Sequence, residues 1–248
     1  MKFLVISDLH GNLEVLDKMD DLFKKADAVL FAGDFAKFEH EETGLPALEK
    51  LCAKHEQIFS VLGNCDNPDF ISETEKRDVS VQGGLVMSAG LAFAGSGGGS
   101  KFTGTTPNER SDEDLVSDFS IITNQGDQEW NNLIAIMHNP PKDTKCDTIP
   151  GGIHVGSQLL REFIEKYKPL AVITGHIHES AGIDIIGSTT VINPGALTEG
   201  KYAWLEAEKS GDNWCVKSAT LESLYFEAAS KTIEGLTCYF EVQNLNPK

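Results

Sequence analysis

The sequence of 248 residues has no apolar run approaching about 18 residues, the length that a membrane-spanning helix needs, so we expect no membrane association. Its apolar start, Phe3 to Ile6, is far shorter than the core of a signal peptide, and Asp8 follows almost at once. The five cysteines are odd in number and have no Cys-x-x-Cys spacing, so they predict no disulfide framework. We therefore expect a cytoplasmic protein.

Basic charge is also scarce. The chain carries 21 Lys and Arg against 38 Asp and Glu, a formal net charge of -17, and its Lys and Arg do not cluster. Because phosphate backbones are held chiefly by clustered basic side chains, this balance argues against binding of duplex nucleic acid. The argument is weaker against small phosphorylated substrates, because bound divalent cations can reverse the local field inside an acidic protein.

The apolar periodicity predicts alternating strands and helices, without an internal repeat, a low-complexity tract or a linker. We expect single strands at 2–7, 28–32, 58–62, 133–137 and 170–174, paired strands at 79–94, 183–192 and 202–221, and helices at 13–22, 46–54 and 157–167. Such a pattern is typical of the α/β class. We predict a single domain over residues 1–248, a four-layer α-β-β-α sandwich of two mixed sheets with helices on the outer faces.

Five short polar clusters each follow a predicted strand. They are Asp8-Leu9-His10, Gly33-Asp34, Gly63-Asn64-Cys65-Asp66, Met137-His138-Asn139 and Gly175-His176-Ile177-His178. Ligands of open α/β sheets bind at the carboxyl ends of strands, so groups remote in sequence can converge there. Taken singly, each cluster would more often be a surface loop or a helix cap, but the whole ordered set indicates a metal site.

The ordered set DxH, GD, GN, H and GHxH resembles the calcineurin-like metallophosphoesterase family over roughly Met1 to Gly195. The resemblance implies one metal held by Asp8, His10, Asp34 and His178, and a second held by Asp34, Asn64, His138 and His176. Asp34 would bridge the two ions. The implied activity is hydrolysis of phosphodiester or phosphomonoester bonds in a small phosphorylated substrate, with Asp34, Asn64 and His138 as catalytic residues.

The ligand chemistry is consistent with two divalent transition metal ions. A carboxylate can span ions about 3.5–4 Å apart, and mixed nitrogen and oxygen ligation suits Mn, Fe, Ni, Co or Zn better than Mg or Ca. We rank manganese first. The implied mechanism is in-line attack on phosphorus by a metal-bridging hydroxide, which is available at neutral pH because bound metal lowers the pKa of water.

One position departs from the more familiar pattern of the family, which has histidine directly after the metal-binding asparagine. Here that position is Cys65, and the GNCD form resembles a branch of small bacterial and archaeal phosphodiesterases. A thiol with a reference pKa of about 8.5 is a poor proton donor, so substrates with good leaving groups should be favoured. We expect Asn64, Cys65 and His154 to contact substrate, although His154 could equally serve only to shape the start of the helix that follows it.

Other readings of these segments stay open. The glycine-rich Gly95 to Ser100 could cradle a phosphate, but no helix follows, so we interpret it as a flexible or closely packed turn. Asn193-Pro194-Gly195 is a turn that the resemblance places behind the metal site. A nucleotide pyrophosphohydrolase could use the same site. A non-catalytic scaffold with this fold ranks lower, since a scaffold has no reason to retain all seven ligands.

Overall fold

The computed structural model describes residues 1–211, 213–225 and 231–234, and two six-stranded sheets dominate it. The first sheet has the order β16-β15-β14-β1-β2-β3 and consists of β1 (Lys2–Ile6), β2 (Ala28–Phe31), β3 (Ile58–Ser60), β14 (Lys201–Ser210), β15 (Asn213–Ser223) and β16 (Lys231–Glu234). Strands β1, β2 and β3 run parallel, whereas β14 pairs antiparallel with β1, so the sheet is mixed.

The second sheet has the order β12-β13-β11-β8-β5-β4. It consists of β4 (Leu85–Ser88), β5 (Leu91–Ser96), β8 (Leu133–Met137), β11 (Ala171–Ile173), β12 (Gly182–Ile186) and β13 (Thr189–Asn193). Its four central strands are parallel and both edge strands are antiparallel to their neighbours. Two small two-stranded sheets lie beside it, formed by β6 (Gly99–Ser100) with β7 (Glu109–Arg110), and by β9 (Thr148–Ile149) with β10 (Ile153–His154).

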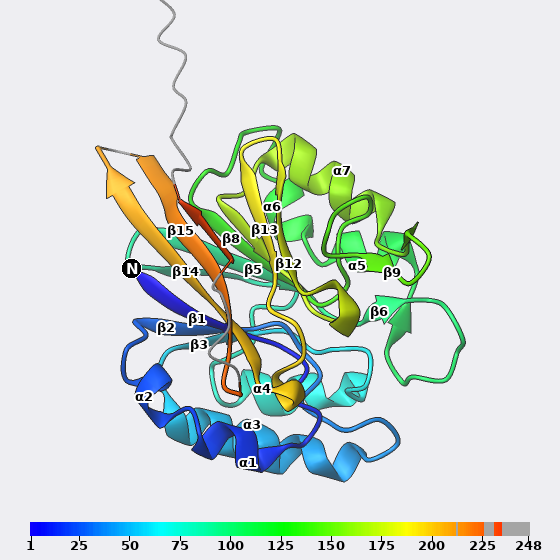
Figure 1. Cartoon of the computed structure of the whole chain (residues 1–248). Coiled ribbons are helices and arrows are strands. Elements are labelled where there is room, and N and C mark those ends of the chain that lie inside the picture. The colour runs from blue at the N-terminus through cyan, green and yellow to red at the C-terminus, as the bar shows by residue number, and fades with distance from the viewer. Residues whose placement is uncertain (212, 226–230, 235–248) are drawn as a thin grey trace, which may run out of the picture.

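Helices cover the outer faces of the two large sheets (Figure 1). Those on the first sheet are α1 (Leu13–Asp17), α2 (Asp20–Phe23), α3 (Gly44–Lys54) and α4 (Ile71–Glu75); those on the second are α5 (Asp112–Ser117), α6 (Ser120–Thr123) and α7 (Gln158–Tyr167). Single 3-10 turns lie at η1 (Glu41–Thr43), η2 (Pro68–Phe70), η3 (His178–Ser180) and η4 (Leu197–Glu199). No helix in the described ranges is long and apolar enough to cross a bilayer.

Side-chain alternation along the strands produces the layers. In β1, Phe3 and Val5 face the core between the sheets, while Leu4 and Ile6 pack beneath α1 and α3. In β8, Ile136 faces the same central core and its neighbours pack beneath α7. Central strands buried on both faces account for their continuous apolar runs. The predicted four-layer sandwich is therefore confirmed.

Several predicted boundaries differ from the structure. The helix expected at 13–22 is interrupted at Lys18 and Met19, although Asn12 caps α1 through a hydrogen bond from the backbone N–H of Val15. The pairing expected over 79–94 is confirmed only for β4 and β5. The hairpin of β14 and β15 turns at Gly211, as expected. Helices α5 and α6 and the β9–β10 hairpin were not predicted.

Candidate metal centre

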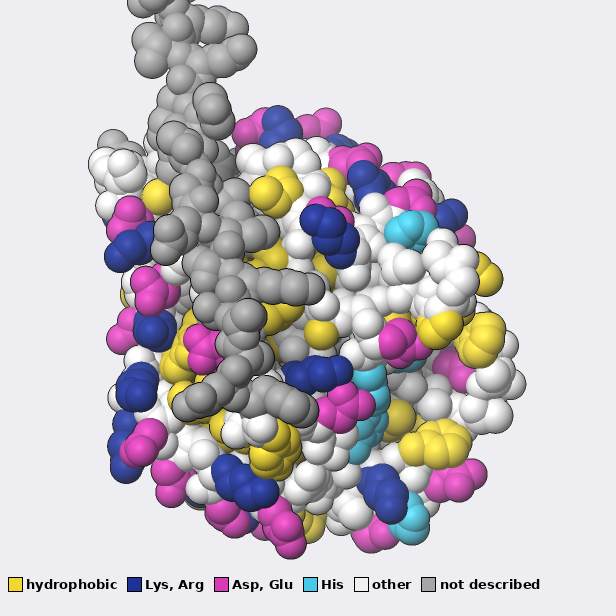
Figure 2. All heavy atoms as spheres, viewed as in Figure 1, with side chains coloured by type: hydrophobic (Ala, Val, Ile, Leu, Met, Phe, Trp, Pro, Cys, Tyr) yellow, Lys and Arg dark blue, Asp and Glu magenta, His cyan; other side chains and the backbone are white. Residues whose placement is uncertain are grey.

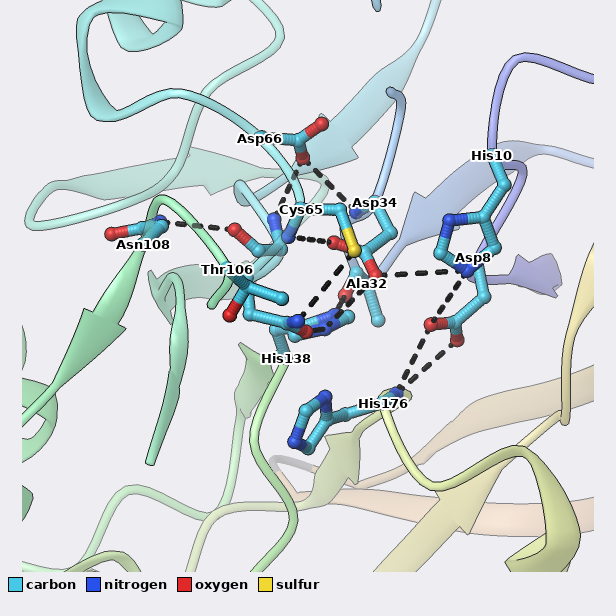
Figure 3. Close-up of polar contacts among 12 residues, drawn as sticks. Asp8, His10, Ala32, Asp34, Cys65, Asp66, Thr106, Asn108, His138 and His176 are labelled. Carbon is cyan, nitrogen blue, oxygen red and sulfur yellow. Dashed lines mark hydrogen bonds and ion pairs between the residues drawn. The ribbon is translucent and has the colours of Figure 1, made fainter. Parts of the chain in front are cut away.

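The five polar clusters follow β1, β2, β3, β8 and β11, and their side chains converge on one space between the loops (Figure 3). On one side, Nε2 of His178 lies 3.1 Å from Oδ1 of Asp8 and 3.3 Å from Nε2 of His10. On the other side, Nε2 of His138 lies 2.8 Å from Oδ1 of Asn64, and the rings of His138 and His176 are 5.2 Å apart. These are the two groups that the sequence predicted.

Asp34 lies between the two groups. Its Oδ2 atom is 3.7 Å from Nε2 of His10 and 3.6 Å from Nε2 of His138. Its other oxygen, Oδ1, accepts a 2.8 Å hydrogen bond from the backbone N–H of Cys65. One carboxylate oxygen is thus fixed by the backbone, and the other faces both groups of predicted ligands.

Four of the seven predicted ligands have left-handed backbone conformations. The φ angles are 57° at Asp8, 47° at His10, 61° at Asp34 and 68° at His176. Residues with a side chain rarely adopt such angles, which cost about 1–3 kcal/mol each and cluster at functional sites. This concentration of strain marks the centre independently of the residue types.

The glycines of the motifs allow close packing around the ligands. A Cβ on Gly63 would lie 1.9 Å from Oδ1 of Asp34, and a Cβ on Gly175 would lie 2.0 Å from Oγ of Ser7 and 2.6 Å from Oδ2 of Asp8. No larger residue fits these positions without displacing a neighbour. The glycine before each of these ligands is therefore a steric requirement.

Backbone carbonyls orient two of the histidine rings. Nδ1 of His138 lies 2.6 Å from the carbonyl oxygen of Ala32, and Nδ1 of His10 lies 3.3 Å from that of Ala36. Because a carbonyl only accepts, this network assigns the proton to Nδ1 and leaves the lone pair of Nε2 directed into the centre. This is the tautomer that binds a metal through Nε2.

Burial and neighbouring charges set the protonation of the centre. Burial, together with the nearby His138, lowers the pKa of His176 to about 4, so this ring is neutral at pH 7. Burial alone would raise the pKa of Asp8, but the hydrogen bond from His178 and the surrounding histidines outweigh it and lower that pKa. His176 is therefore neutral and Asp8 ionised, the states in which each can bind a cation, whereas, despite burial, the Asp8 carboxylate raises the pKa of His178.

Asp66 supports the centre from behind, a role that the sequence did not reveal. Its buried carboxylate accepts hydrogen bonds from the backbone N–H groups of Asp34 (3.0 Å), Phe35 (3.2 Å), Ala36 (2.8 Å) and Gly63 (2.8 Å). It therefore joins the loop that carries Asp34 to the loop that carries Asn64. The available signal was a second carboxylate two residues after the asparagine.

The two remaining predicted residues differ in position. Cys65 is 8% exposed and its Sγ lies within 4.8 Å of ligand atoms of His10 and Asp34, so the thiol faces the centre. His154 lies on β10, where its Nδ1 is 2.7 Å from the buried carboxylate of Asp147. No hydrogen bond joins His154 to any of the seven predicted ligands, which all lie in the described part of the chain. It belongs to a flanking hairpin whose Thr148 carbonyl accepts a hydrogen bond from Ser180.

Two turns of uncertain role are now placed. The glycine-rich segment runs from the end of β5 through a turn at Gly97 and Gly98 into β6, and it is closely packed, because a Cβ on Gly99 would lie 3.1 Å from Cβ of Asn64 and 3.2 Å from Cε1 of His176. The side-chain amide of Asn193 donates to the carbonyl of Ile177 at 2.9 Å, which puts the Asn-Pro-Gly turn directly behind the last motif.

The centre is open on one side. His178 and His10 keep 34% and 16% of their side-chain surface exposed, whereas Asp8 and His138 are buried. Figure 2 shows histidine side chains reaching the surface of the viewed face among acidic and basic side chains. A ligand can therefore reach the centre from the side of His10 and His178.

A sequence model of the calcineurin-like phosphoesterase family matches residues 1–180, a span that contains all seven predicted ligands. The uncharacterized protein MJ1162 of Methanocaldococcus jannaschii is 32% identical over 200 residues, 78% of this chain and 88% of that protein. Among solved structures, TT1561 of Thermus thermophilus and a dimetal phosphatase from Danio rerio each align with 94% of this chain and 98% of their own. Both have a TM-score of 0.62, at 17% and 12% identity, and show a shared fold.

Proposed function

Because this chain belongs to the calcineurin-like phosphoesterase family, and is therefore a metal-dependent hydrolase of phosphoric esters, we propose that it cleaves phosphodiester or phosphomonoester bonds at a centre of two divalent metal ions. One observation carries the proposal: seven Asp, Asn and His side chains from five separate loops converge on a single space. The substrate is a small phosphorylated molecule, since two cations would attract a phosphate into this otherwise acidic protein.

The donor set fits two cations that share Asp34. Asp8, His10 and His178 would complete one site, and Asn64, His138 and His176 the other. Oδ2 of Asp34 lies 3.7 and 3.6 Å from the nearest histidine nitrogens of the two groups, and Oδ1 already accepts a hydrogen bond from the amide of Cys65, so Asp34 would offer Oδ2 to the ions. Neutral imidazole and amide donors leave the two cations with only two ligand carboxylates, so the centre keeps positive charge.

Mixed nitrogen and oxygen donors favour Mn, Fe, Ni, Co or Zn, and we propose manganese first. When bound, two such ions supply Lewis acidity, which lowers the pKa of water and offsets charge on the phosphoryl oxygens. The role of the chain is to hold their ligands. The Nδ2 group of Asn64 donates to Sγ of Cys65 at 3.6 Å, which turns its Oδ1 toward Nε2 of His138 at 2.8 Å, and these two acceptor atoms would share one cation.

Cys65 contributes no proton in this mechanism. Burial and the adjacent Asp34 carboxylate both raise the pKa of its thiol, so it stays neutral and gives up its proton reluctantly. The leaving group must then depart without help from this residue. We propose that esters of acidic alcohols, which need little protonation, are cleaved fastest.

Two broader proposals accompany this one. A single domain over residues 1–248 is supported by the core that the two sheets share. A cytoplasmic location is supported by the odd cysteine count of the sequence and by Cys52, Cys65 and Cys146, which are present as thiols.

Metal reloading tests the proposed function. Protein stripped of metal and reloaded with Mn, Ni, Zn or Mg should bind two ions per chain and hydrolyse members of a panel of aryl monoesters, aryl diesters, cyclic nucleotides and nucleotide pyrophosphates. Asp34→Asn should lose metal at both positions and lower kcat/KM at least about 100-fold, because the shared carboxylate supplies charge to each ion.

Asp17→Asn is the matched control, because Asp17 is an exposed acid that forms ion pairs with Lys50 and Lys54. Metal content is measured by mass spectrometry alongside turnover. A wild-type protein that takes up one ion or none would contradict the dinuclear centre. An Asp34→Asn variant with two ions and normal turnover would contradict the bridging role.

A further inference from the structure

Residues 101–108, here named the rim loop, leave and return to the metal centre. The loop starts after Gly99, where an added Cβ would touch Asn64 and His176 at 3.1 and 3.2 Å. It ends at Asn108, whose backbone N–H donates to the carbonyl of Asn64 at 3.1 Å and whose side chain donates to that of Gly63 at 3.0 Å (Figure 3). Both ends of the loop therefore rest on residues of the centre.

A single carboxylate orders the rim loop from inside. Glu109 accepts hydrogen bonds from the backbone N–H groups of Phe102 (2.8 Å), Gly104 (2.9 Å) and Thr105 (3.1 Å), and from the hydroxyl of Thr106 (3.2 Å). The bond from Phe102 contributes most to lowering the pKa of Glu109 to about 2, so the carboxylate is ionised at every physiological pH. The loop is thus held in one shape although residues 101–105 are exposed.

Phe102 projects from this ordered loop into solvent. It is 89% exposed, against 59% for Met87, the next most exposed large hydrophobic residue in the described part of the chain. Phe102 is three residues from Gly99, so their Cα atoms are at most about 11 Å apart. This upper bound allows the ring to contact a group esterified to a phosphate held at the metal centre. An aromatic ring on a rigid backbone loses little entropy when a planar group stacks on it.

We propose that Phe102 stacks on the leaving group of the substrate, and that the enzyme prefers esters whose leaving group carries a planar ring, either a nucleobase or an aryl group. This inference rests on the proposed function, because it places the phosphate in the metal centre. It extends that function from a reaction type to a substrate class. It also supplies a reason for an ordered loop with an exposed aromatic tip beside the centre.

Binding of non-hydrolysable phosphonates tests the proposal without relying on turnover. Methylphosphonate, phenylphosphonate and a nucleoside phosphonate share the phosphoryl end and differ in the group attached to it. Their dissociation constants are measured by calorimetry on manganese-loaded protein. Phe102→Ala should weaken the binding of phenylphosphonate, of the nucleoside phosphonate or of both by roughly 5- to 150-fold. It should change the dissociation constant of methylphosphonate by less than about twofold. The phosphonate whose binding weakens identifies the preferred ring as an aryl group or a nucleobase.

Two further variants act as controls. Phe102→Trp keeps a ring and should keep the affinities, whereas Met87→Ala removes an exposed apolar side chain from β4 and should change none of them. Phe102→Ala could change the affinities for all three phosphonates equally, or change none of them. If the wild type still binds methylphosphonate and hydrolyses esters, that result overturns only the role of Phe102. If the loaded wild type binds no phosphonate and hydrolyses no ester, the proposed function fails with it.

Discussion

Replacing Gly63 by alanine should disable the metal centre by contact alone. Gly63 does not have a positive φ, so alanine can adopt its backbone conformation. The added Cβ, however, would lie 1.9 Å from Oδ1 and 2.4 Å from the backbone nitrogen of Asp34. The substitution therefore removes no donor atom and introduces no strained φ, and it acts only through the steric contact with Asp34.

The magnitude follows from the geometry. Cβ atoms essentially never lie closer than 3.0 Å to another heavy atom, so Asp34 or the backbone of residue 63 must shift by about 1 Å. That shift breaks the 2.8 Å hydrogen bond from Cys65 to Oδ1. Misplacing a catalytic group by about 1 Å can lower a rate about 100-fold, and overpacking costs about 1–3 kcal/mol of stability. We expect kcat/KM to fall at least about 100-fold and Tm to fall by about 2–10 °C.

The assay combines kcat/KM on an aryl phosphodiester, metal content per chain and Tm. Gly84→Ala is the matched control, because Gly84 also lacks a positive φ and its added Cβ would meet only the carbonyl oxygen of Val81, at 4.0 Å. The control should be neutral or slightly stabilising. A Gly63→Ala variant with two ions per chain and kcat/KM within about threefold of wild type would refute the argument that this contact fixes Asp34.

Three further changes test other parts of the site. Asp66→Asn should weaken metal binding about 10- to 100-fold, because its NH2 group would face backbone N–H donors; an unchanged affinity in competition with a chelator would contradict this. Cys65→His should raise the ratio of kcat/KM on alkyl esters to kcat/KM on aryl esters by about 100-fold or more, since imidazole can donate the proton that the thiol retains. An unchanged ratio with two ions bound would mean that residue 65 does not face the leaving group. The hydrogen bond to Asp147 raises the pKa of His154, so its stabilisation is complete below the unfolded pKa of about 6.5 and is lost as pH rises through the folded pKa. The Tm difference between wild type and His154→Gln should therefore shrink as pH rises, and a constant difference would count against this linkage.

The strands and the motifs at their ends could be predicted because each is encoded locally. The run from Phe3 to Ile6 is apolar at every position, which is typical of a strand buried on both faces, and Asp8 follows after only Ser7. The region between Ser100 and Leu133 was harder, because its helices are short and Leu115 is the only fully buried residue of α5. Its capping box at Ser111 and Asp114 was the available local signal.

The left-handed conformations of the ligands could not be predicted, because they are stabilised by contacts between loops. The backbone N–H of Asp8 donates to the carbonyl of Gly33 at 2.9 Å, that of His10 to Asp34 at 3.0 Å, and that of Gly11 to Phe35 at 2.8 Å. These bonds join the loop after β1 to the loop after β2, and they offset the strain at both loops. Neither loop alone forms the hydrogen bonds that offset the strain of this conformation. The same bonds hold the backbone of Asp8 and His10 against the loop that carries Asp34. Residue types at strand ends therefore predict which side chains could bind a metal, whereas only the packing of one loop on another determines how close together these side chains lie.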